Sequence, residues 1–299
     1  MLTGIRVVIM GGDARQIEVI SKLSELDASV TLVGFDHLQN QYPGVAKADM
    51  DEEIFKTSDA LILPVMGTDD MGHVESVFCS TDIVLTEHYI NLLPKHAKIL
   101  TGMAKPYLKK LCVKYQIELV ELLDRDDVAI YNSIPTAEGA IMMAIQNTDF
   151  TIHGATSAVL GFGRTGITMA RTLQGMGSKV KVGVRREEHY ARAWESGFAP
   201  FFIKDLLGHV GDVDLLFNTI PTMIITAQII ANIPHQSLII DLASKPGGTD
   251  FRYAEKRGVK AMLAPGLPGI VAPKTAGQIL ARALSQLIFE MSAKRRNAQ

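Results

Sequence analysis

Short apolar runs alternate with amphipathic stretches along the first part of this chain. The runs have the length and β-branched content of buried strands, whereas the stretches between them repeat apolar residues at helical spacing. Strands separated by helices predict a parallel sheet with helices on its faces. Apolar runs lie at residues 6–10, 29–34, 59–63, 98–101 and 118–122, and helical patterns follow the first run to about residue 26 and cover 86–93 and 106–115.

The second half of the chain repeats this plan. When the halves are superposed on their first strands, Gly11 falls on Gly161 and Phe35 falls on Arg185. The two halves share architecture, not sequence. We therefore expect an α/β fold of two Rossmann-like, doubly wound parallel-sheet domains joined by hinge helices. The apolar runs of the second half lie at residues 157–160, 180–184, 214–218, 238–241 and 260–263.

The turn after residue 160 has the sequence Gly161-Phe-Gly163-Arg-Thr-Gly166 and opens a helix. Gly161 permits the tight turn, Gly163 lets the backbone approach a pyrophosphate, and Gly166 lets the helix pack close to the strand. Unpaired N–H groups at the start of the helix would face the phosphates. Strand, turn, helix and second strand in register predict a dinucleotide site; the alternative is a glycine-rich turn that binds nothing.

The second strand of this unit indicates which dinucleotide binds. An NAD site usually carries an acidic residue about 20 positions after the glycines, where it holds the ribose 2′-hydroxyl. Here Arg185, 24 positions after Gly161, and Arg186 take that place. A guanidinium binds a 2′-phosphate through a planar pair of charge-assisted hydrogen bonds. The sequence therefore favours NADP, with two solvated surface arginines as the alternative.

The first copy of the motif differs at the positions that a dinucleotide needs. Asp13 and Gln16 stand where the second copy has Gly163 and Gly166, so we expect no dinucleotide there. Asp13 is expected to cap the first turn of the helix, and its carboxylate disfavours a phosphate. Arg15 would lie over the carboxyl edge of the sheet, where it binds an anionic substrate or is a plain surface arginine.

Two helices are expected to connect the domains. Ser133 and Pro135 precede an apolar stretch rich in Gly, Ala and Met, which predicts a capped helix at a hinge. The last helical pattern, about 274–290, has an apolar stripe suited to packing on the first domain. The chain would thus leave a cleft between two sheets. The expected parts are a Rossmann-like or flavodoxin-like substrate domain (1–130), a hinge helix (131–150), an NADP-binding domain (151–272) and a C-terminal helix on the N-terminal domain (273–299).

The net charge, the length of the apolar segments and the cysteine content exclude several classes of protein. The net charge of −2 gives no electrostatic argument for nucleic acid or an anionic membrane. The apolar segments are shorter than the roughly 18 residues of a bilayer span, and the first is too short for a signal peptide. Cys79, Cys112, His73, His88 and His96 lack ligand-like spacing, so we expect no metal and place these histidines on the surface or in loops. The sequence predicts a cytoplasmic protein with small-molecule or protein partners.

Four segments together resemble one family: GGDARQ, LGFGRTG, DLASKPGG and GLPGIVAPKTAG. Over essentially the whole chain they are similar to the A subunits of bacterial dipicolinate synthases, and more distantly to D-2-hydroxy acid and alanine dehydrogenases. The resemblance implies NADP-dependent oxidation of dihydrodipicolinate to dipicolinate, the calcium-chelating acid of endospores, in the mother-cell cytoplasm during sporulation. It also implies that the partner is the flavoprotein-like B subunit of dipicolinate synthase, and it leaves a homo-oligomer open.

Aromatising a dihydropyridine ring needs little acid–base machinery. The enzyme must hold the ring against the nicotinamide, neutralise two carboxylates and provide one proton acceptor or water. Two Gly- and Pro-rich loops at strand ends, 241–248 and 265–275, are expected to shape the substrate side, against a purely structural role. The expected substrate and catalytic residues are Arg15, Lys245 and Lys274 for the carboxylates, Ser133 and Thr136 as hydroxyl donors, and Asp13 or Glu138 as proton acceptor.

The chain leaves the strand at 214–218 where the nicotinamide half of a dinucleotide commonly lies, and the next strand ends at Asp241. The expected cofactor contacts are Gly161, Gly163, Arg164, Thr165, Gly166, Arg185, Arg186, Asn218, Thr219, Ile220, Pro221 and Asp241.

Two other functions stay open. One is an NADP-dependent dehydrogenase of a small hydroxy or amino acid, although His209 and His235 lie in unsuitable contexts for it. The other is a nucleotide-sensing, non-catalytic subunit.

Overall fold

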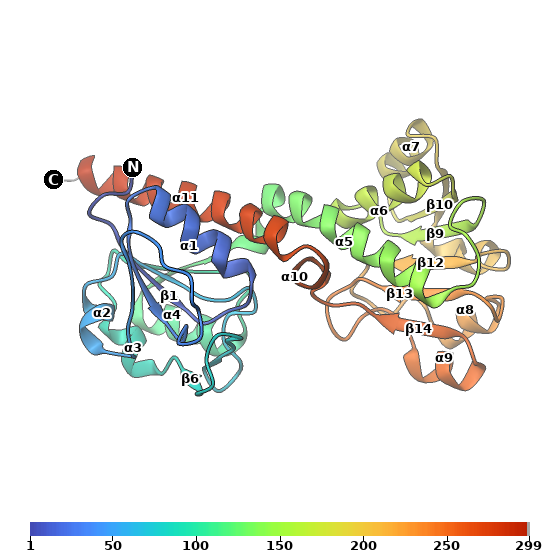
Figure 1. Ribbon diagram of the computed structural model, residues 1–299. Helices are drawn as coiled ribbons and strands as arrows, with labels where there is room; N and C mark the ends of the chain where they lie inside the picture. The colour runs from blue at the N-terminus through green and yellow to red at the C-terminus, as the bar shows by residue number, and fades with distance from the viewer. Residues whose placement is uncertain (298–299) are drawn as a thin grey trace. The chain divides into compact units, whose positions relative to one another are not determined.

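The computed structural model describes residues 1–297, so the last two residues of the predicted C-terminal helix lie outside the described part. The chain divides into two compact units, the first formed by 1–129 with 272–299 and the second by 130–271. Each unit contains one six-stranded sheet whose strands all run parallel, with helices packed on its faces (Figure 1). The predicted fold class, two Rossmann-like doubly wound sheets, is confirmed.

The sheet of the first unit has the order β3-β2-β1-β4-β7-β8. Leaving aside a short hairpin, this is the strand order of a dinucleotide-binding fold, in which the direction of winding reverses between β1 and β4. Ligands of open α/β sheets bind at the carboxyl ends of the strands at that reversal. The strands are β1 (Arg6–Met10), β2 (Ser29–Val33), β3 (Val45–Lys47), β4 (Ala60–Ile62), β7 (Lys98–Thr101) and β8 (Glu118–Glu121).

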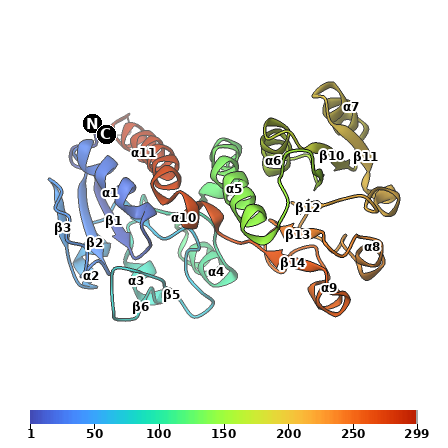
Figure 2. The ribbon, with the colours of Figure 1, turned by 45° about the vertical axis from the view of Figure 1, so that its right-hand side comes forward.

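Helices α1 (Arg15–Glu25) and α11 (Pro273–Asn297) lie side by side in the first unit (Figures 1 and 2). Leu280, Leu284 and Ile288 of α11 share one apolar core with α1 and the sheet. Gly277 permits this approach, since a Cβ there would lie 2.5 Å from the carbonyl oxygen of Arg15. The unit also contains α2 (Glu52–Lys56), the hairpin strands β5 (His73–Val74) and β6 (Ile83–Val84), α3 (Glu87–Leu92), α4 (Pro106–Tyr115) and the 3₁₀ turn η1 (Leu122–Asp124).

The sheet of the second unit has the order β11-β10-β9-β12-β13-β14, the same plan without the hairpin. Apolar side chains alternate between two cores, one on each face, as both faces of a parallel sheet are covered. The strands are β9 (Thr156–Leu160), β10 (Lys179–Val184), β11 (Ala199–Phe202), β12 (Leu215–Asn218), β13 (Leu238–Asp241) and β14 (Lys260–Leu263). The helices are α6 (Arg164–Gly175), α7 (Glu187–Glu195), η2 (Ile203–His209), α8 (Ala227–Ala231), α9 (Phe251–Arg257) and α10 (Leu267–Val271).

Helix α5 (Asp126–Asn147) begins earlier than the sequence pattern predicted. The prediction of a helix capped at Ser133 was wrong, because Pro135 lies inside the helix and not in its first turn. Asp126 and Asp127 occupy the first turn instead, where negative charge stabilises the amino end of a helix. Beyond Pro135 the helix packs into the second unit: a Cβ on Gly139 would lie 3.0 Å from the side chain of Leu267 in α10.

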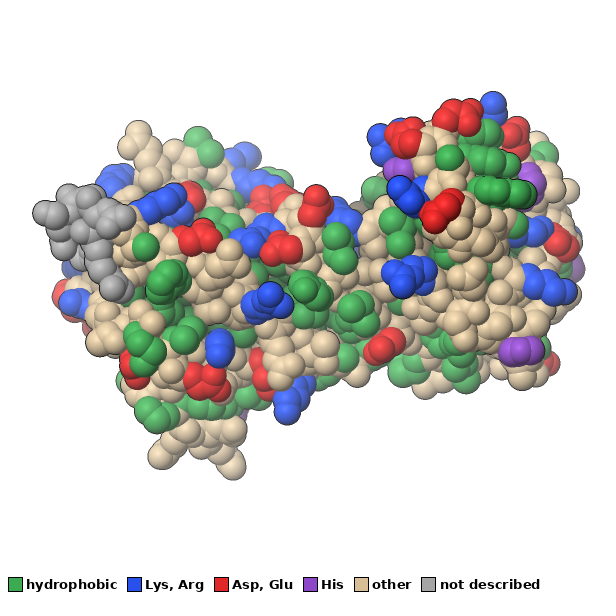
Figure 3. All heavy atoms as spheres, turned by 90° about the horizontal axis from the view of Figure 1, so that it is seen from above, with side chains coloured by type: hydrophobic (Ala, Val, Ile, Leu, Met, Phe, Trp, Pro, Cys, Tyr) green, Lys and Arg blue, Asp and Glu red, His purple; other side chains and the backbone are tan. Residues whose placement is uncertain are grey.

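The surface carries charges of both signs. On the face drawn in Figure 3, Lys and Arg side chains are interspersed with Asp and Glu over both units. Within residues 1–297, no helix combines the length and the apolar character needed to cross a membrane.

Candidate functional site

The glycine-rich turn of the second unit lies between β9 and α6, at the carboxyl end of the central strand. Gly161 has φ +98°, a conformation that side-chain-bearing residues rarely adopt, and its N–H donates to the carbonyl of Gly183 at 2.9 Å. Thr219, at the end of neighbouring β12, donates its hydroxyl to the carbonyl of Leu160 at 2.8 Å. A Cβ on Gly161 would lie 2.4 Å from that hydroxyl oxygen, so the turn and the end of β12 fit only around a glycine.

Gly166 and Gly163 differ in what surrounds them. A Cβ on Gly166 would lie 2.0 Å from the carbonyl oxygen of Gly161, so this glycine allows α6 to approach the turn. A Cβ on Gly163 would meet no described atom within 4 Å, so packing within the protein does not require this glycine. Arg164 and Thr165 follow as the first residues of α6, with Arg164 exposed and Thr165 half-buried. The space over Gly163 and the amino end of α6 is therefore suited to an anion.

Two arginines follow β10. Arg186 is already occupied: its Nε lies 3.0 Å from a carboxylate oxygen of Glu188, and Nη2 lies 2.8 Å from Nε2 of His189. Arg185 is exposed, and no hydrogen bond or ion pair joins it to another residue of the described part. Arg185 is therefore the better placed of the two to bind a phosphate.

Asn218 and Asp241, at the ends of adjacent strands, are fully buried and bonded to each other. The amide of Asn218 donates to an Asp241 oxygen and to the carbonyl of Ile220, at 3.0 Å each. Asp241 also accepts from the backbone N–H of Ala243 and Gly248 and from the hydroxyl of Thr249, at 3.1, 2.8 and 2.7 Å. The two side chains hold loops 219–225 and 242–249, so the structure places them as supports of the loops beside the turn.

Four further residues predicted for the site differ in exposure and in the unit to which they belong. Ile220 is buried and its N–H donates to Oδ1 of Asn218 at 3.0 Å, whereas the next residue, Pro221, is exposed. Lys245 is exposed on loop 242–249. Lys274, the second residue of α11, is exposed and belongs to the first unit.

The three residues predicted on α5 have different surroundings. The hydroxyl of Ser133 is buried and lies 2.6 Å from both the carbonyl of Ile130 and the hydroxyl of Thr168 in α6. The hydroxyl of Thr136 donates to the carbonyl of Asn132 at 2.8 Å. Both hydroxyl groups are thus engaged within the helices, while Glu138 is exposed.

In the first unit the corresponding turn is filled by the protein itself. A Cβ on Gly12 would lie 2.4 Å from the side chain of Gln16, which stands at the place of Gly166. Segment 75–77 also covers the turn, since the N–H of Gly12 donates to Glu75 and the N–H of Val77 donates back to Gly12, at 2.8 and 2.9 Å. Gln16 and this segment fill the turn of the first unit, whereas the space beside Gly163 in the other unit is open.

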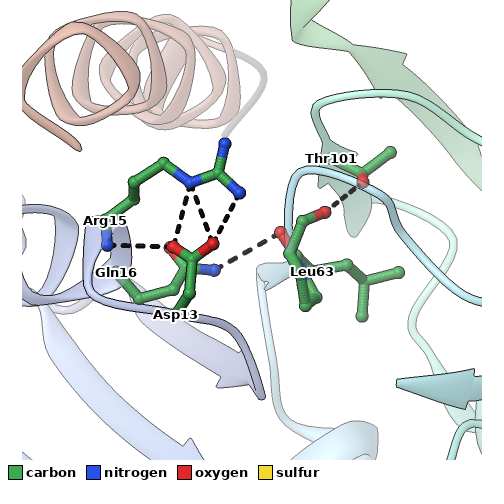
Figure 4. A network of polar contacts seen from close by, with 6 residues as sticks. Asp13, Arg15, Gln16, Leu63 and Thr101 are labelled. Atoms are coloured by element: carbon green, nitrogen blue, oxygen red, sulfur yellow. Dashed lines mark hydrogen bonds and ion pairs between the residues drawn. The ribbon is translucent and has the colours of Figure 1, made fainter. Parts of the chain in front are cut away.

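Asp13 and Arg15 form an ion pair (Figure 4). Nε of Arg15 lies 2.9 and 3.1 Å from the two oxygens of Asp13, and Nη2 lies 2.6 Å from one of them. The backbone N–H of Arg15, the first residue of α1, also donates to Oδ1 of Asp13 at 3.0 Å. The prediction that Asp13 is the cap residue was wrong, because the chain enters the helix one residue later, at Ala14. Burial raises the pKa of Asp13, but the hydrogen bonds and charge of Arg15 outweigh it, so the pKa lies below its usual value.

A pocket of about 200 Å³ opens beside this pair at the carboxyl end of the sheet, entirely within the first unit. Besides Asp13 and Arg15, its charged or titratable wall includes Asp69, His73 and Lys105. None of these three was predicted as a site residue. Lys105 sits just before α4, and His73 on a two-residue strand that the sequence pattern did not reveal.

Comparison with known proteins assigns the family. Residues 6–123 match the family model described as the N-terminal domain of the dipicolinate synthase A subunit, and 151–286 match that of the NADPH-binding domain of acetohydroxy acid isomeroreductase. The dipicolinate synthase A subunit of Bacillus subtilis (strain 168) is 51% identical over 294 residues, covering 98% of this chain and 99% of the relative. The chain belongs to the family of dipicolinate synthase A subunits. The predicted resemblance is thus confirmed, and the NADPH-binding domain family agrees with the predicted cofactor.

Solved structures agree with this family. The crystal structure of the dipicolinate synthase A subunit from Bacillus halodurans has 55% sequence identity and a TM-score of 0.95, covering 96% of this chain and 99% of that one. A transhydrogenase from Sinorhizobium meliloti has 15% identity and a TM-score of 0.70, covering 95% of this chain and 94% of that one. The second likeness concerns the fold alone.

Proposed function

We propose that this chain is the NADP-dependent subunit of a dipicolinate synthase and oxidises dihydrodipicolinate to dipicolinate. The observation that carries the proposal is the turn at Gly161 to Gly166, where two glycines are required by packing and the third, Gly163, faces open space. That arrangement fits a pyrophosphate lying over the amino end of α6. The name of the relatives, matched over nearly the whole chain, supplies the product.

The reaction is a two-electron oxidation of a ring. Dihydrodipicolinate loses a hydride from one saturated ring carbon and a proton from its neighbour. Two ring C–H bonds break, and one further double bond forms in the ring. Bound NADP⁺ would accept the hydride and become NADPH. The protein must bind two carboxylates, exclude competing orientations and give the proton an acceptor. The aromatic product supplies much of the driving force.

We propose that the substrate occupies the pocket of the first unit. Arg15 uses its backbone N–H, Nε and Nη2 for Asp13, and among the described residues no acceptor is bonded to Nη1. Lys105 lines the same pocket and has no ion pair with a described residue. Nη1 of an arginine and the ammonium of a lysine in one pocket suit the two carboxylates of a small dicarboxylate. Lys245 and Lys274, both exposed, remain secondary candidates.

The test is turnover by the purified chain with and without its partner subunit. With dihydrodipicolinate and NADP⁺, we expect NADPH absorbance and dipicolinate to appear in equal amounts. Reversible turnover of small hydroxy or amino acids would instead support a general dehydrogenase. NADP binding without turnover, even with the partner subunit present, would contradict the proposal and indicate a nucleotide-sensing subunit.

Replacing Arg185 by alanine tests the choice of cofactor. A charge-assisted hydrogen bond contributes about 1.5–3 kcal/mol, so we expect the Kd for NADP⁺ to rise roughly 10- to 100-fold. The Kd for NAD⁺, which has no 2′-phosphate, should change less than about 3-fold. Isothermal titration calorimetry measures both. Arg192→Ala is the matched control, because Arg192 is an exposed arginine on α7 that pairs with Glu195. Equal losses for the two nucleotides would contradict a role on the 2′-phosphate.

A further inference from the structure

His73 lies in the wall of the pocket proposed for the substrate, on strand β5 just after a tight turn. Within the turn, the N–H of Asp69 donates to the carbonyl of His73 at 2.9 Å. The N–H of Leu85, just after β6, donates to the carbonyl of Gly72 at 2.9 Å and ties the turn to the second strand of the hairpin. Pairing of β5 with β6 adds a third restraint. His73 therefore projects from a well-restrained hairpin.

Asp69 fixes the orientation of the His73 ring. One oxygen of Asp69 accepts the backbone N–H groups of Met71 and His73, at 2.8 Å each, and the other lies 3.0 Å from Nδ1 of His73. Burial raises the pKa of Asp69, but the hydrogen bonds from His73 and Met71 outweigh it and leave the pKa below its usual value. A carboxylate that stays charged holds the proton of a neutral imidazole on Nδ1, so the lone pair lies on Nε2.

This geometry separates His73 from the other histidine–carboxylate pairs of the first unit. His88 and His96 each turn Nε2 toward a carboxylate, of Glu52 and Asp59, at 3.0 and 2.9 Å. Neither belongs to the wall of the pocket. In His73 the carboxylate occupies Nδ1 and leaves Nε2 for another partner, which is the arrangement of an oriented base.

Two groups of the pocket can bind a substrate carboxylate beside this base. The wall carries two cations, Arg15 and Lys105, and three carboxylates, those of Asp13, Asp69 and Glu75. Asp13 is paired with Arg15, which leaves Lys105 and Nη1 of Arg15 for a substrate. Glu75 is exposed, and Asp69 contacts Nδ1 of the imidazole and not Nε2. Asp13, the acceptor expected from the sequence, is a weak base because Arg15 depresses its pKa.

We propose that His73, oriented by Asp69, is the general base of the oxidation. Nε2 takes the proton from the saturated ring carbon next to the one that loses hydride, and the electron pair of that C–H bond becomes the new ring double bond. Bound NADP⁺ would accept the hydride, and the imidazolium returns its proton to water. The substrate carboxylates lie on Arg15 and Lys105. This inference rests on the proposed function and adds the residue that performs its proton transfer.

His73→Gln tests it in the complete complex with the partner subunit. Loss of a general base typically costs 10²- to 10⁴-fold, so we expect kcat to fall at least 100-fold while the Kd for NADP⁺ changes less than about 3-fold. His88→Gln is the matched control, an exposed histidine paired with Glu52 outside the pocket, and should keep full activity. Added imidazole should raise the activity of His73→Gly at least 10-fold. Thermal melting checks that this variant folds.

Asp69→Asn separates positioning from a structural role. It removes the carboxylate that holds the proton of the neutral imidazole on Nδ1, so kcat should fall about 10-fold while KM changes little. If His73→Gln keeps more than half of kcat, or imidazole rescues nothing, the inference is wrong and the proposed function stands. If the wild-type complex makes no NADPH, the proposed function fails and this inference fails with it.

Discussion

Replacing Asp241 by alanine is expected to lower the free energy of unfolding of the second unit by about 3–5 kcal/mol, a cost typical of breaking a buried charged network. The carboxylate accepts hydrogen bonds from Asn218, Ala243, Gly248 and Thr249, and it is fully buried. Its removal leaves several buried donors without an acceptor, which is more costly than losing an equal number of exposed bonds. Urea unfolding followed by circular dichroism and by Trp194, the single tryptophan, measures the change.

Asp250→Ala is the matched control for this measurement. Asp250 lies in the same unit and caps α9, where its side chain accepts one N–H, from Tyr253 at 3.0 Å. Losing such a cap costs about 1 kcal/mol. Similar losses in the two variants would contradict the view that Asp241 holds two loops together through a buried network.

The strands of both sheets could be predicted because their hydrophobic signal is strong. The inner strands of a doubly wound sheet are buried on both faces, so each is a largely apolar run, and β1, β7 and β13 have the predicted bounds. β14, at the edge of its sheet, also has the predicted bounds. β3 (Val45–Lys47) was not predicted, because it is a three-residue edge strand with an exposed face. Its pairing with β2 depends on the completed sheet, not on its own sequence.

The start of α5 shows where local signals mislead. Ser133 followed by Pro135 is a sequence typical of a helix start, since proline fits the first turn and serine caps it. In the structure the proline lies in the helix interior, and the hydroxyl of Ser133 contacts Thr168 of α6. Tertiary packing of the apolar residues around Pro135 outweighs the backbone hydrogen bond that proline cannot make.

The candidate site was predicted where backbone geometry dictates the residue and missed where it depends on side-chain contacts that form only in the folded loops. Glycines in a strand–turn–helix leave few alternatives, so the turn at Gly161 was evident from sequence. The role of Asp241 depends on a loop that folds back over it, and the pairing of Asp13 with Arg15 depends on rotamers. His73 has no motif at all, because its partner Asp69 and its pocket come together only through the hairpin.

Gly163→Ala should abolish most NADP binding while leaving the fold intact. Its Cβ would meet no described protein atom, so the free energy of unfolding should stay within about 0.5 kcal/mol of wild type or rise slightly. The same methyl group would project into the space proposed for the pyrophosphate. We therefore expect the Kd for NADP⁺ to rise about 100-fold, equivalent to about 2.7 kcal/mol. Calorimetric titration and urea unfolding on one preparation measure both quantities.

Two glycines of α6, the helix that follows Gly163, provide the controls for this experiment. Gly175, the last residue of α6, also has open space around its Cβ, so Gly175→Ala should change neither binding nor stability. Gly166→Ala places a Cβ 2.0 Å from the carbonyl oxygen of Gly161, so the affinity for NADP⁺ should fall and the free energy of unfolding should fall by about 1–3 kcal/mol. Wild-type affinity in Gly163→Ala would mean that the nucleotide does not lie over this turn, because a nucleotide bound there would clash with the added methyl group.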